Sequence, residues 1–304
     1  MIQIVNTNTD FRNPDISQED LKQTASSATV VTNYAQASIT AVPVLRNMPD
    51  WYVPINTDIK TVQGNSRNWI SQICPRISRQ IPQTIIDFNG QFQRSGHNLG
   101  NIFGAISKQP SGKPTIAQRK SVTDLLSDIL AQVNTQQKNV TETLSAVSAY
   151  VTTVNNNQQM LANDLSIATS KFLDGAKSVA EMTAVIGENF IDNNILGPCS
   201  VIVNINMNIS LKVSGLNINP ALITIIYAKA ILENQLGNMR LSQLAVQNIL
   251  DAWAITHKKF ELVISDLNDA ADDDYASCFK QLDFEVAQRQ WQQLADFAQN
   301  LMTT

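Results

Sequence analysis

The sequence predicts an all-α protein: an elongated bundle of four to five long helices with a small hydrophobic β-hairpin, a β-tongue, as its head. Three observations support this prediction. The ten prolines leave two stretches of just over 80 residues without proline, Thr115–Gly197 and Ala221–Thr304. An apolar repeat of helical period runs through the first stretch. The segment Val203–Val213, which follows it, alternates apolar and polar residues instead.

Two helices are expected before the first long stretch. Residues 17–40 have helical periodicity, and Ser17 is suited to the N-cap position. A proline-rich connector follows, and residues 57–106 then form a second helix. We expect interruptions near Pro75 and Pro82, because proline lacks the amide hydrogen that the helix interior requires.

The longest helix is predicted over residues 115–189. Its apolar residues recur about every 3.5 positions, the spacing of a coiled-coil seam, with polar interruptions at Gln136 and Gln158. At 1.5 Å per residue such a helix would be roughly 110 Å long. The seam residues are Val122, Leu126, Ile129, Val133, Val140, Leu144, Val147, Val151, Val154, Leu161, Leu165, Ala168 and Phe172.

The C-terminal stretch is expected to be helical as well, with two apolar stripes. A break between the stripes is expected either at residues 254–259 or at residues 267–274. The stripes consist of Leu236, Met239, Leu244, Ile249, Leu250 and Trp253, and of Phe279, Leu282, Val286, Trp291, Leu294, Phe297 and Leu301.

The alternating segment Val203–Val213 has the pattern of a β-strand with one bare apolar face. Gly197 and Pro198 end the preceding helix, and Ser214–Gly215 can turn the strand back. Pro220 then suits the first turn of the next helix, whose opening residues are nearly all apolar.

This part of the chain carries almost no charge. Of the forty residues between Asp192 and Glu233, only Lys212 and Lys229 are charged. Apolar surface of this extent marks a site for a membrane or a protein partner, or else a hairpin tucked against the helix ends as a capping subdomain. The residues that we expect to insert into a membrane are Val201, Val203, Ile205, Met207, Ile209, Leu211, Val213, Leu222, Ile223, Ile225, Ile226 and Tyr227.

These assignments divide the chain into a tail and a head. The tail is a helical bundle formed by residues 1–192 and 221–304. The head comprises residues 193–232, and its β-tongue covers about residues 199–219. Burial of each apolar strand side chain contributes about 1.5–3 kcal/mol, so the head should be shielded in water and released by a second apolar environment.

Composition limits the function classes. Only 16% of the residues are charged, the net charge is −4, and no cluster of Lys and Arg could follow a phosphate backbone, so no nucleic-acid partner is expected. The first residues lack a basic segment and an apolar core, so we expect no cleavable signal peptide. No run of 18 apolar residues predicts a constitutive membrane span.

No pattern indicates an enzyme, and we expect neither a cofactor nor a metal. The two histidines, His97 and His257, fall on different predicted helices, and His97 is expected at the surface. Nucleophile-elbow, phosphate-loop, HExxH and CxxC motifs are lacking. The acidic run at residues 269–274 does not have the spacing of a calcium loop and is expected to be a solvated turn.

The three cysteines, Cys74, Cys199 and Cys278, are widely spaced. Their spacing fits neither a metal site nor a redox motif. We expect them to be ordinary small apolar residues, although one disulfide among them remains open.

One segment, residues 65–92, resembles the second helix of the Bacillus haemolytic enterotoxin components, those of haemolysin BL and of the non-haemolytic enterotoxin. The pattern is an Asn, a Trp four residues later, a Pro six beyond it, an Ile pair, an aromatic-Asn dipeptide and a further aromatic residue. Pro82 departs from it, because those proteins more often carry a polar residue there. The matching positions are Asn65, Trp69, Pro75, Ile85, Ile86, Phe88, Asn89 and Phe92.

The wider layout is similar to that of the superfamily of α-helical pore-forming toxins that includes cytolysin A. The resemblance implies a secreted, water-soluble toxin, or one component of a multi-component toxin. Such a protein binds a target-cell membrane through its head, rearranges, and assembles with copies of itself or with sister components into a pore. The alternative is a non-lytic helical adaptor or structural protein whose apolar head docks a partner protein.

Overall fold

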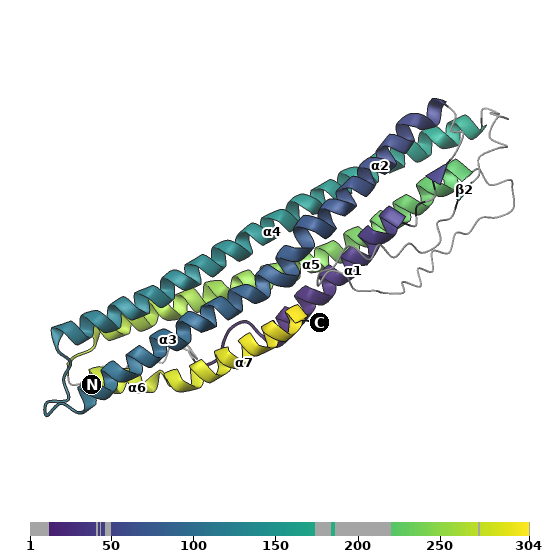
Figure 1. Ribbon diagram of the computed structural model, residues 1–304. Coiled ribbons are helices and arrows are strands. Elements are labelled where there is room, and N and C mark those ends of the chain that lie inside the picture. The colour runs from purple at the N-terminus through teal and green to yellow at the C-terminus, as the bar shows by residue number, and fades with distance from the viewer. Residues whose placement is uncertain are drawn as a thin grey trace. The chain divides into compact units, whose positions relative to one another are not determined.

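The computed structural model of this 304-residue chain describes residues 12–40, 42, 44–45, 50–173, 184–185, 220–272 and 274–303. Within these ranges the chain is helical except for one two-residue antiparallel strand pair and short turns (Figure 1). The elements are α1 (Gln18–Thr40), β1 (Val44–Leu45), the 3₁₀ turn η1 (Asp50–Tyr52), α2 (Val53–Asn68), the π-helical turns η2 (Trp69–Ile73) and η3 (Arg76–Gln80), α3 (Ile81–Ser107), α4 (Ile116–Leu173), β2 (Ala184–Val185), α5 (Pro220–Asp269), α6 (Tyr275–Gln281) and α7 (Phe284–Thr303).

The chain forms two compact units, and the helices α4 and α5 contribute to both. The predicted helical class is confirmed for the described residues. The predicted β-tongue at 199–219 lies outside them. Unit 1 consists of Met1–Gln23, Arg79–Thr143 and Ala245–Thr304, and unit 2 consists of Thr24–Ser78 and Leu144–Leu244.

Several predicted helix ends are confirmed. Ser17 and Asp20 form a reciprocal capping box, in which the Asp20 amide donates to Ser17 Oγ at 3.1 Å and the Ser17 amide donates to Asp20 Oδ2 at 2.9 Å. The helix α5 begins at Pro220, as expected, and ends at Asp269. The C-terminal break therefore falls in residues 267–274 rather than at 254–259.

The two prolines of the second predicted helix distort it without ending it. A helical run extends from Val53 to Ser107, and two π-helical turns flank Cys74 and Pro75. A π turn admits one extra residue per hydrogen bond and so accommodates a position that cannot donate one. Pro82 lies in the first turn of α3, where its missing amide hydrogen is tolerated.

The helix α4 contains the predicted coiled-coil seam. Its 58 described residues correspond to about 87 Å, and the predicted continuation to residue 189 lies outside the described residues. After Val140 the prediction is confirmed at Val147, Val154, Leu161 and Ala168, which are buried. It is wrong at Leu144, Val151 and Leu165, which are only half-buried, because the residue before each of them is buried instead. The buried positions alternate by three and four residues without interruption: Val122, Leu126, Ile129, Val133, Gln136, Val140, Thr143, Val147, Tyr150, Val154, Asn157, Leu161, Asp164 and Ala168.

From Gln136 onwards, every second position of this seam is polar or carries a polar group, and these positions are seven residues apart. The other half of the seam stays apolar throughout, from Leu126 to Ala168. A polar residue repeated at one core position of a heptad fixes the register of a helix at a cost in stability. The polar set comprises Gln136, Thr143, Tyr150, Asn157 and Asp164, all at most 5% exposed.

Unit 1 is held together by aromatic side chains from α3, α5 and α7. The ring centroids of Phe88 and Trp291 lie 4.4 Å apart, and Trp253 lies 5.2 Å from Phe88 and 5.7 Å from Trp291. All three side chains are at most 3% exposed. Burying such rings stabilises the unit through both their area and their edge-to-face contacts.

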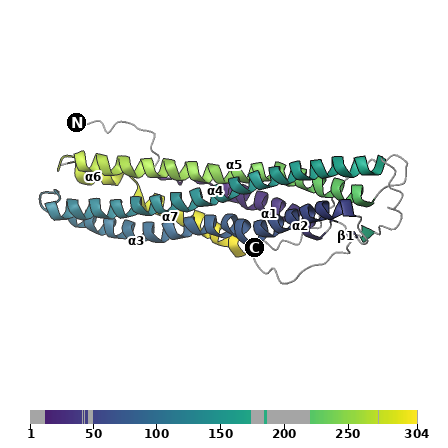
Figure 2. The same cartoon turned by 90° about the horizontal axis from the view of Figure 1, so that it is seen from above.

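The helices α3 and α7 run side by side in unit 1 (Figures 1 and 2). Amide side chains link them: Asn89 Nδ2 donates to Gln292 Oε1 at 2.9 Å, and Gln93 Nε2 donates to the Gln288 carbonyl at 2.7 Å. Gln288 Nε2 in turn lies 3.1 Å from Gln93 Oε1. The Gln288 amide fills the space beside the Cα of Gly96.

Arg119, in the first turn of α4, stabilises the far end of α5. Its guanidinium pairs with Asp272 at 2.6 Å, donates to the Ala270 carbonyl at 2.8 Å, and lies 4.3 Å from the centroid of the Tyr275 ring. Arginine at the last carbonyls of a helix satisfies groups that have no partner within the helix. The acidic run is an exposed turn, as expected, and its Asp272 pairs with the arginine that caps α5.

Two glycines of α3 should respond in opposite directions to the same substitution. A Cβ at Gly96 would lie 2.6 Å from Gln288 Nε2, so Gly96→Ala must displace this amide and its hydrogen bonds, and we expect a destabilisation of about 1–3 kcal/mol. Gly100 is exposed, with nothing within 4 Å of the position that a methyl group would take, so Gly100→Ala should stabilise by about 0.5–1 kcal/mol. Urea unfolding of both variants measures the difference, and equal effects would contradict the packing of α7 on α3.

Candidate functional site

The predicted membrane-inserting residues fall into two groups. The seven in the strand, from Val201 to Val213, lie outside the described residues. The other five are in the first turns of α5, where Ile225 is fully buried and Ile226 is 36% exposed. Leu222 and Tyr227 are half-buried, and the side chain of Ile223 is not described.

The first turns of α5 bury one apolar face within unit 2. Ala228, Ile231 and Leu232 are at most 1% exposed and continue the face that begins with Ile225. On the solvent side, Lys229 and Glu233 form an ion pair one turn apart. No helix of the described ranges contains an 18-residue window that is apolar enough to cross a membrane.

Two polar residues of the α4 seam, Tyr150 and Asn157, form hydrogen bonds to side chains of other helices in unit 2. Tyr150 accepts a hydrogen bond from Gln235 Nε2 of α5 at 3.1 Å, and burial raises the pKa of Tyr150 to about 12. One heptad further, Asn157 Oδ1 accepts a hydrogen bond from Asn65 Nδ2 of α2 at 3.1 Å. These contacts tie α4 to both of its neighbours through buried hydrogen bonds.

The first two residues of the enterotoxin-like motif therefore have identifiable structural roles in unit 2. Asn65 pairs with Asn157, as described above. Trp69 is fully buried, donates from Nε1 to Thr32 Oγ1 of α1 at 3.0 Å, and packs on the Tyr150 ring with 5.2 Å between centroids. Together they connect α1, α2 and α4.

Of the later motif residues, Pro75 belongs to unit 2, and those from Ile85 onwards belong to unit 1. Phe88 and Phe92 stack with their centroids 5.5 Å apart, and Asn89 bonds to α7. Ile85 is fully buried beside them, whereas Ile86 is half-buried and Pro75 is half-buried between the π turns. In this structure the motif encodes helix packing.

Two carboxyl groups, those of Asp164 and Asp58, come together at the second-to-last position of the seam. Asp164 of α4 is 5% exposed, and its Oδ2 has no hydrogen-bond partner of acceptable geometry. Burial raises the pKa of Asp164 to about 6, helped by the charge of Asp58 of α2. Tyr52 of η1 is fully buried nearby; burial raises its pKa, and Thr224 of α5 faces its hydroxyl.

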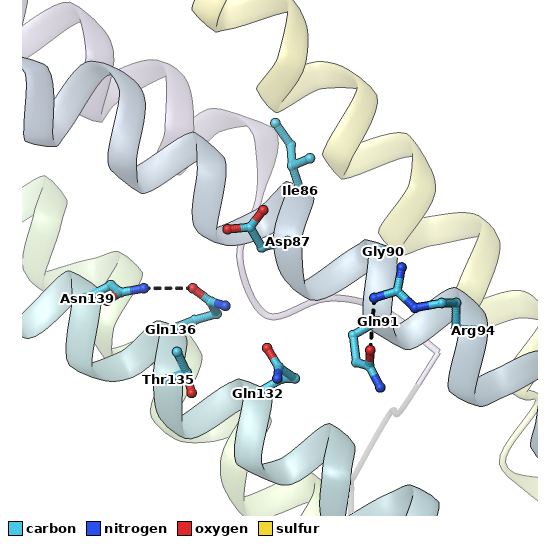
Figure 3. Close-up of a pocket in the computed structure, with 9 residues that line it drawn as sticks. All are labelled: Ile86, Asp87, Gly90, Gln91, Arg94, Gln132, Thr135, Gln136 and Asn139. Carbon is cyan, nitrogen blue, oxygen red and sulfur yellow. Dashed lines mark hydrogen bonds between the residues drawn. The ribbon is translucent and has the colours of Figure 1, made fainter.

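A polar groove of about 440 Å³ lies between α3 and α4 in unit 1, and Figure 3 shows the side chains that line it. They are Ile86, Asp87, Gly90, Gln91, Arg94, Gln132, Thr135, Gln136 and Asn139. Four of the nine are amides, and some of these bond within their own helix, such as Asn139 Nδ2 to Gln136 Oε1 at 3.1 Å. The lining contains neither a histidine nor a cysteine that could act as a nucleophile or base.

Across the described residues, no three His, Cys, Asp or Glu side chains gather as metal ligands. His97 is exposed, as predicted, and His257 lies 3.6 Å from Glu261 one turn along α5. Neither histidine is paired with a catalytic partner in the described contacts.

Cys74 overturns the expectation of ordinary apolar cysteines. It is disulfide-bonded and 1% exposed, with its sulfur 3.2 Å from Thr32 Oγ1. Spacing along the sequence could not show this, because a disulfide requires two cysteines to meet in space rather than at any set separation.

Sequence reasoning did not single out Tyr52, Asp58, Asn157, Asp164 or Thr224. A usable signal for two of them was present. Asn157 and Asp164 continue the seven-residue spacing that begins at Gln136. The remaining three come from α2, η1 and α5, and only the packing brings them to α4.

More than half of the chain matches a known protein family. Residues 12–187 of the 304 match the family model of the Bacillus haemolytic enterotoxin (HBL). No curated protein sequence matches the chain significantly.

Among solved structures, the Bacillus cereus HblL1 toxin component is similar, with a TM-score of 0.64 and 13% identity over 95% of this chain and 97% of that one. Soluble SmhB of the tripartite α-pore-forming toxin Smh from Serratia marcescens has a TM-score of 0.60 and 12% identity, over 94% and 97%. Soluble AhlB of the tripartite α-pore-forming toxin AHL from Aeromonas hydrophila has a TM-score of 0.55 and 15% identity, over 95% and 100%. At these identities the likeness establishes a common fold.

The disulfide of Cys74 can be tested by counting thiols. The chain has three cysteines, so a thiol reagent should titrate one per chain in denaturant without reductant and three after reduction. A non-reducing gel that shows monomer confirms that the bond is within one chain, and peptide mapping identifies whether Cys199 or Cys278 is the partner. Three reactive thiols before reduction would refute the bond.

Proposed function

The chain belongs to the Bacillus haemolytic enterotoxin family, and on that premise we propose that it is one component of a pore-forming toxin. A water-soluble form attaches to a target-cell membrane through the head, rearranges, and assembles with copies of itself or with sister components into a pore. The observation that carries this proposal is the family match over residues 12–187.

The multi-component character is supported by the similar structures. HblL1 is a toxin component, and SmhB and AhlB are each part of a tripartite toxin. We therefore propose that this chain, too, acts with sister components. A secreted location fits such a role, and an enzymatic activity or a nucleic-acid partner forms no part of it. The adaptor alternative is not favoured, because no observation on the described residues supports it over family membership.

The family match ends at residue 187, so the proposal of a membrane-binding head rests on the chemistry of the residues that follow. The eleven residues Val203–Val213 are about as many as a membrane-crossing β-strand needs. Their apolar face would meet lipid, and their Asn-rich face would meet water or neighbouring strands. We propose that residues 193–232 form the membrane-binding head, with a β-tongue at about 199–219.

We further propose that the rearrangement takes place in unit 2, while unit 1 keeps its packing. Unit 2 contains seven of the eight buried polar atoms without a hydrogen-bond partner of acceptable geometry in the described residues. Each such atom costs about 1–3 kcal/mol. The one in unit 1, Trp253 Nε1, belongs to a ring within the aromatic cluster.

Charge placed on the apolar face of the strand tests the head directly. Ile205→Asp combined with Ile209→Asp should weaken attachment to lipid vesicles by on the order of a hundredfold or more, because each aspartate costs about 2.5–3.5 kcal/mol in the hydrocarbon core. Vesicle co-sedimentation measures attachment, and release of an enclosed dye measures leakage.

The polar face provides the matched control. Asn206→Asp combined with Asn208→Asp adds the same charge to the same segment and should leave attachment within a few-fold of the native protein. Attachment without leakage, followed by leakage when sister components are added, is the result expected for a toxin component. Undiminished attachment of the Ile205/Ile209 variant would reject the head assignment.

A further inference from the structure

Asp164 and Asp58 bring two carboxyl groups together inside unit 2. Asp164 occupies a core position of the α4 seam, and Asp58 approaches it from α2, where it is half-buried. Neither carboxylate forms an ion pair in the described part of the chain, and Asp164 Oδ2 is buried without a hydrogen-bond partner of acceptable geometry. Two carboxylates so placed cannot both ionise without repulsion and desolvation.

The other elements packed at this position offer no positive charge to Asp164. From η1 comes the hydroxyl of Tyr52, which is fully buried and stays protonated, since burial raises its pKa. From α5 comes Thr224, which is uncharged and 1% exposed. The cluster is therefore acidic, and binding of one proton would remove the repulsion between its two carboxylates.

We propose that the Asp58–Asp164 pair is a proton-controlled latch: one bound proton holds α2 on α4 in mild acid, and its release weakens this packing as the solution becomes neutral. The protonated carboxyl can donate a hydrogen bond to the other carboxylate, which removes the repulsion and satisfies a buried oxygen in one step.

The direction of the effect follows from linkage. Burial first, and the charge of Asp58 second, raise the pKa of Asp164 from 3.8 to about 6 in the folded chain. The folded state then binds the proton more tightly than the unfolded state. The stabilisation is fully present below about pH 4 and is lost as the pH rises through 6, so this site makes unit 2 weaker at neutral pH than in mild acid.

The latch involves one residue of α4 before the predicted head and one residue of α5 within it. Asp164 is nine residues before the last residue of α4, Leu173, and Thr224 is four residues after the start of α5 at Pro220. If the proposed function holds, mild acid would delay release of the head and neutral pH would favour it. The latch itself rests only on unit 2 and can be tested without a membrane.

Hydrogen–deuterium exchange of the full-length chain at pH 5.0 and 7.5 tests the latch. After correction for intrinsic exchange, peptides from residues 150–173 should be at least about tenfold better protected at pH 5.0 in the native protein. Asp164→Asn, whose amide cannot ionise, should remove this difference. Asp128→Asn, at an exposed position of the same helix, should leave it unchanged.

A second variant provides an independent test in case Asp164→Asn does not fold. Asp58→Asn removes the neighbouring charge, so the transition of the 150–173 peptides should move to lower pH by a few tenths of a unit or more. Equal protection at both pH values in the native protein, or a pH dependence that survives both Asp164→Asn and Asp58→Asn, would overturn the proposal. Vesicle attachment of the native protein at the two pH values then reports separately on the proposed function.

Discussion

The buried seam of α4 is the constraint on which the rest of this protein depends. Its positions repeat by three and four residues from Val122 to Ala168, and from Gln136 onwards one position in every heptad is polar. The apolar half drives the packing of this helix. Two residues of the polar half help to specify the register, because Asn157 must meet Asn65 and Tyr150 must meet Gln235 at the same level of the bundle. A shift by one heptad would separate these pairs and bury their groups unpaired.

The two units differ chemically. Unit 1 fills its core with the rings of Phe88, Trp253 and Trp291 and closes α3 against α7 with paired amides. Unit 2 buries the ring pair of Trp69 and Tyr150 together with hydroxyls, amides and a carboxyl, and seven of these polar side chains have an atom without a hydrogen-bond partner of acceptable geometry. Proteins open first where buried contacts are weakest. This distribution suits the proposed rearrangement, in which the aromatic unit keeps its packing while the polar unit converts.

Much of the fold can be predicted from the sequence because it follows from local rules. The capping box at Ser17, the start of α5 at Pro220 and the long heptad repeat all express helix chemistry within a few residues. After Val140, hydrophobicity predicts one seam position of each heptad and misses the other, since Leu144, Val151 and Leu165 are more apolar than the Thr143, Tyr150 and Asp164 that are buried instead. Partners on α2 and α5 decide that choice. The disulfide of Cys74 and the Asp58–Asp164 pair likewise depend on distant segments meeting in space.

The central claim is that unit 2 yields while unit 1 holds, and hydrogen exchange before and after vesicle attachment measures it most directly. The account predicts that peptides from α2 and from residues 144–173 of α4 lose at least about tenfold protection on attachment. Peptides from α3 and α7, which pack together in unit 1, should keep theirs. Loss of protection in α3 and α7 with residues 144–173 unchanged would contradict the account, and so would an equal loss in both units.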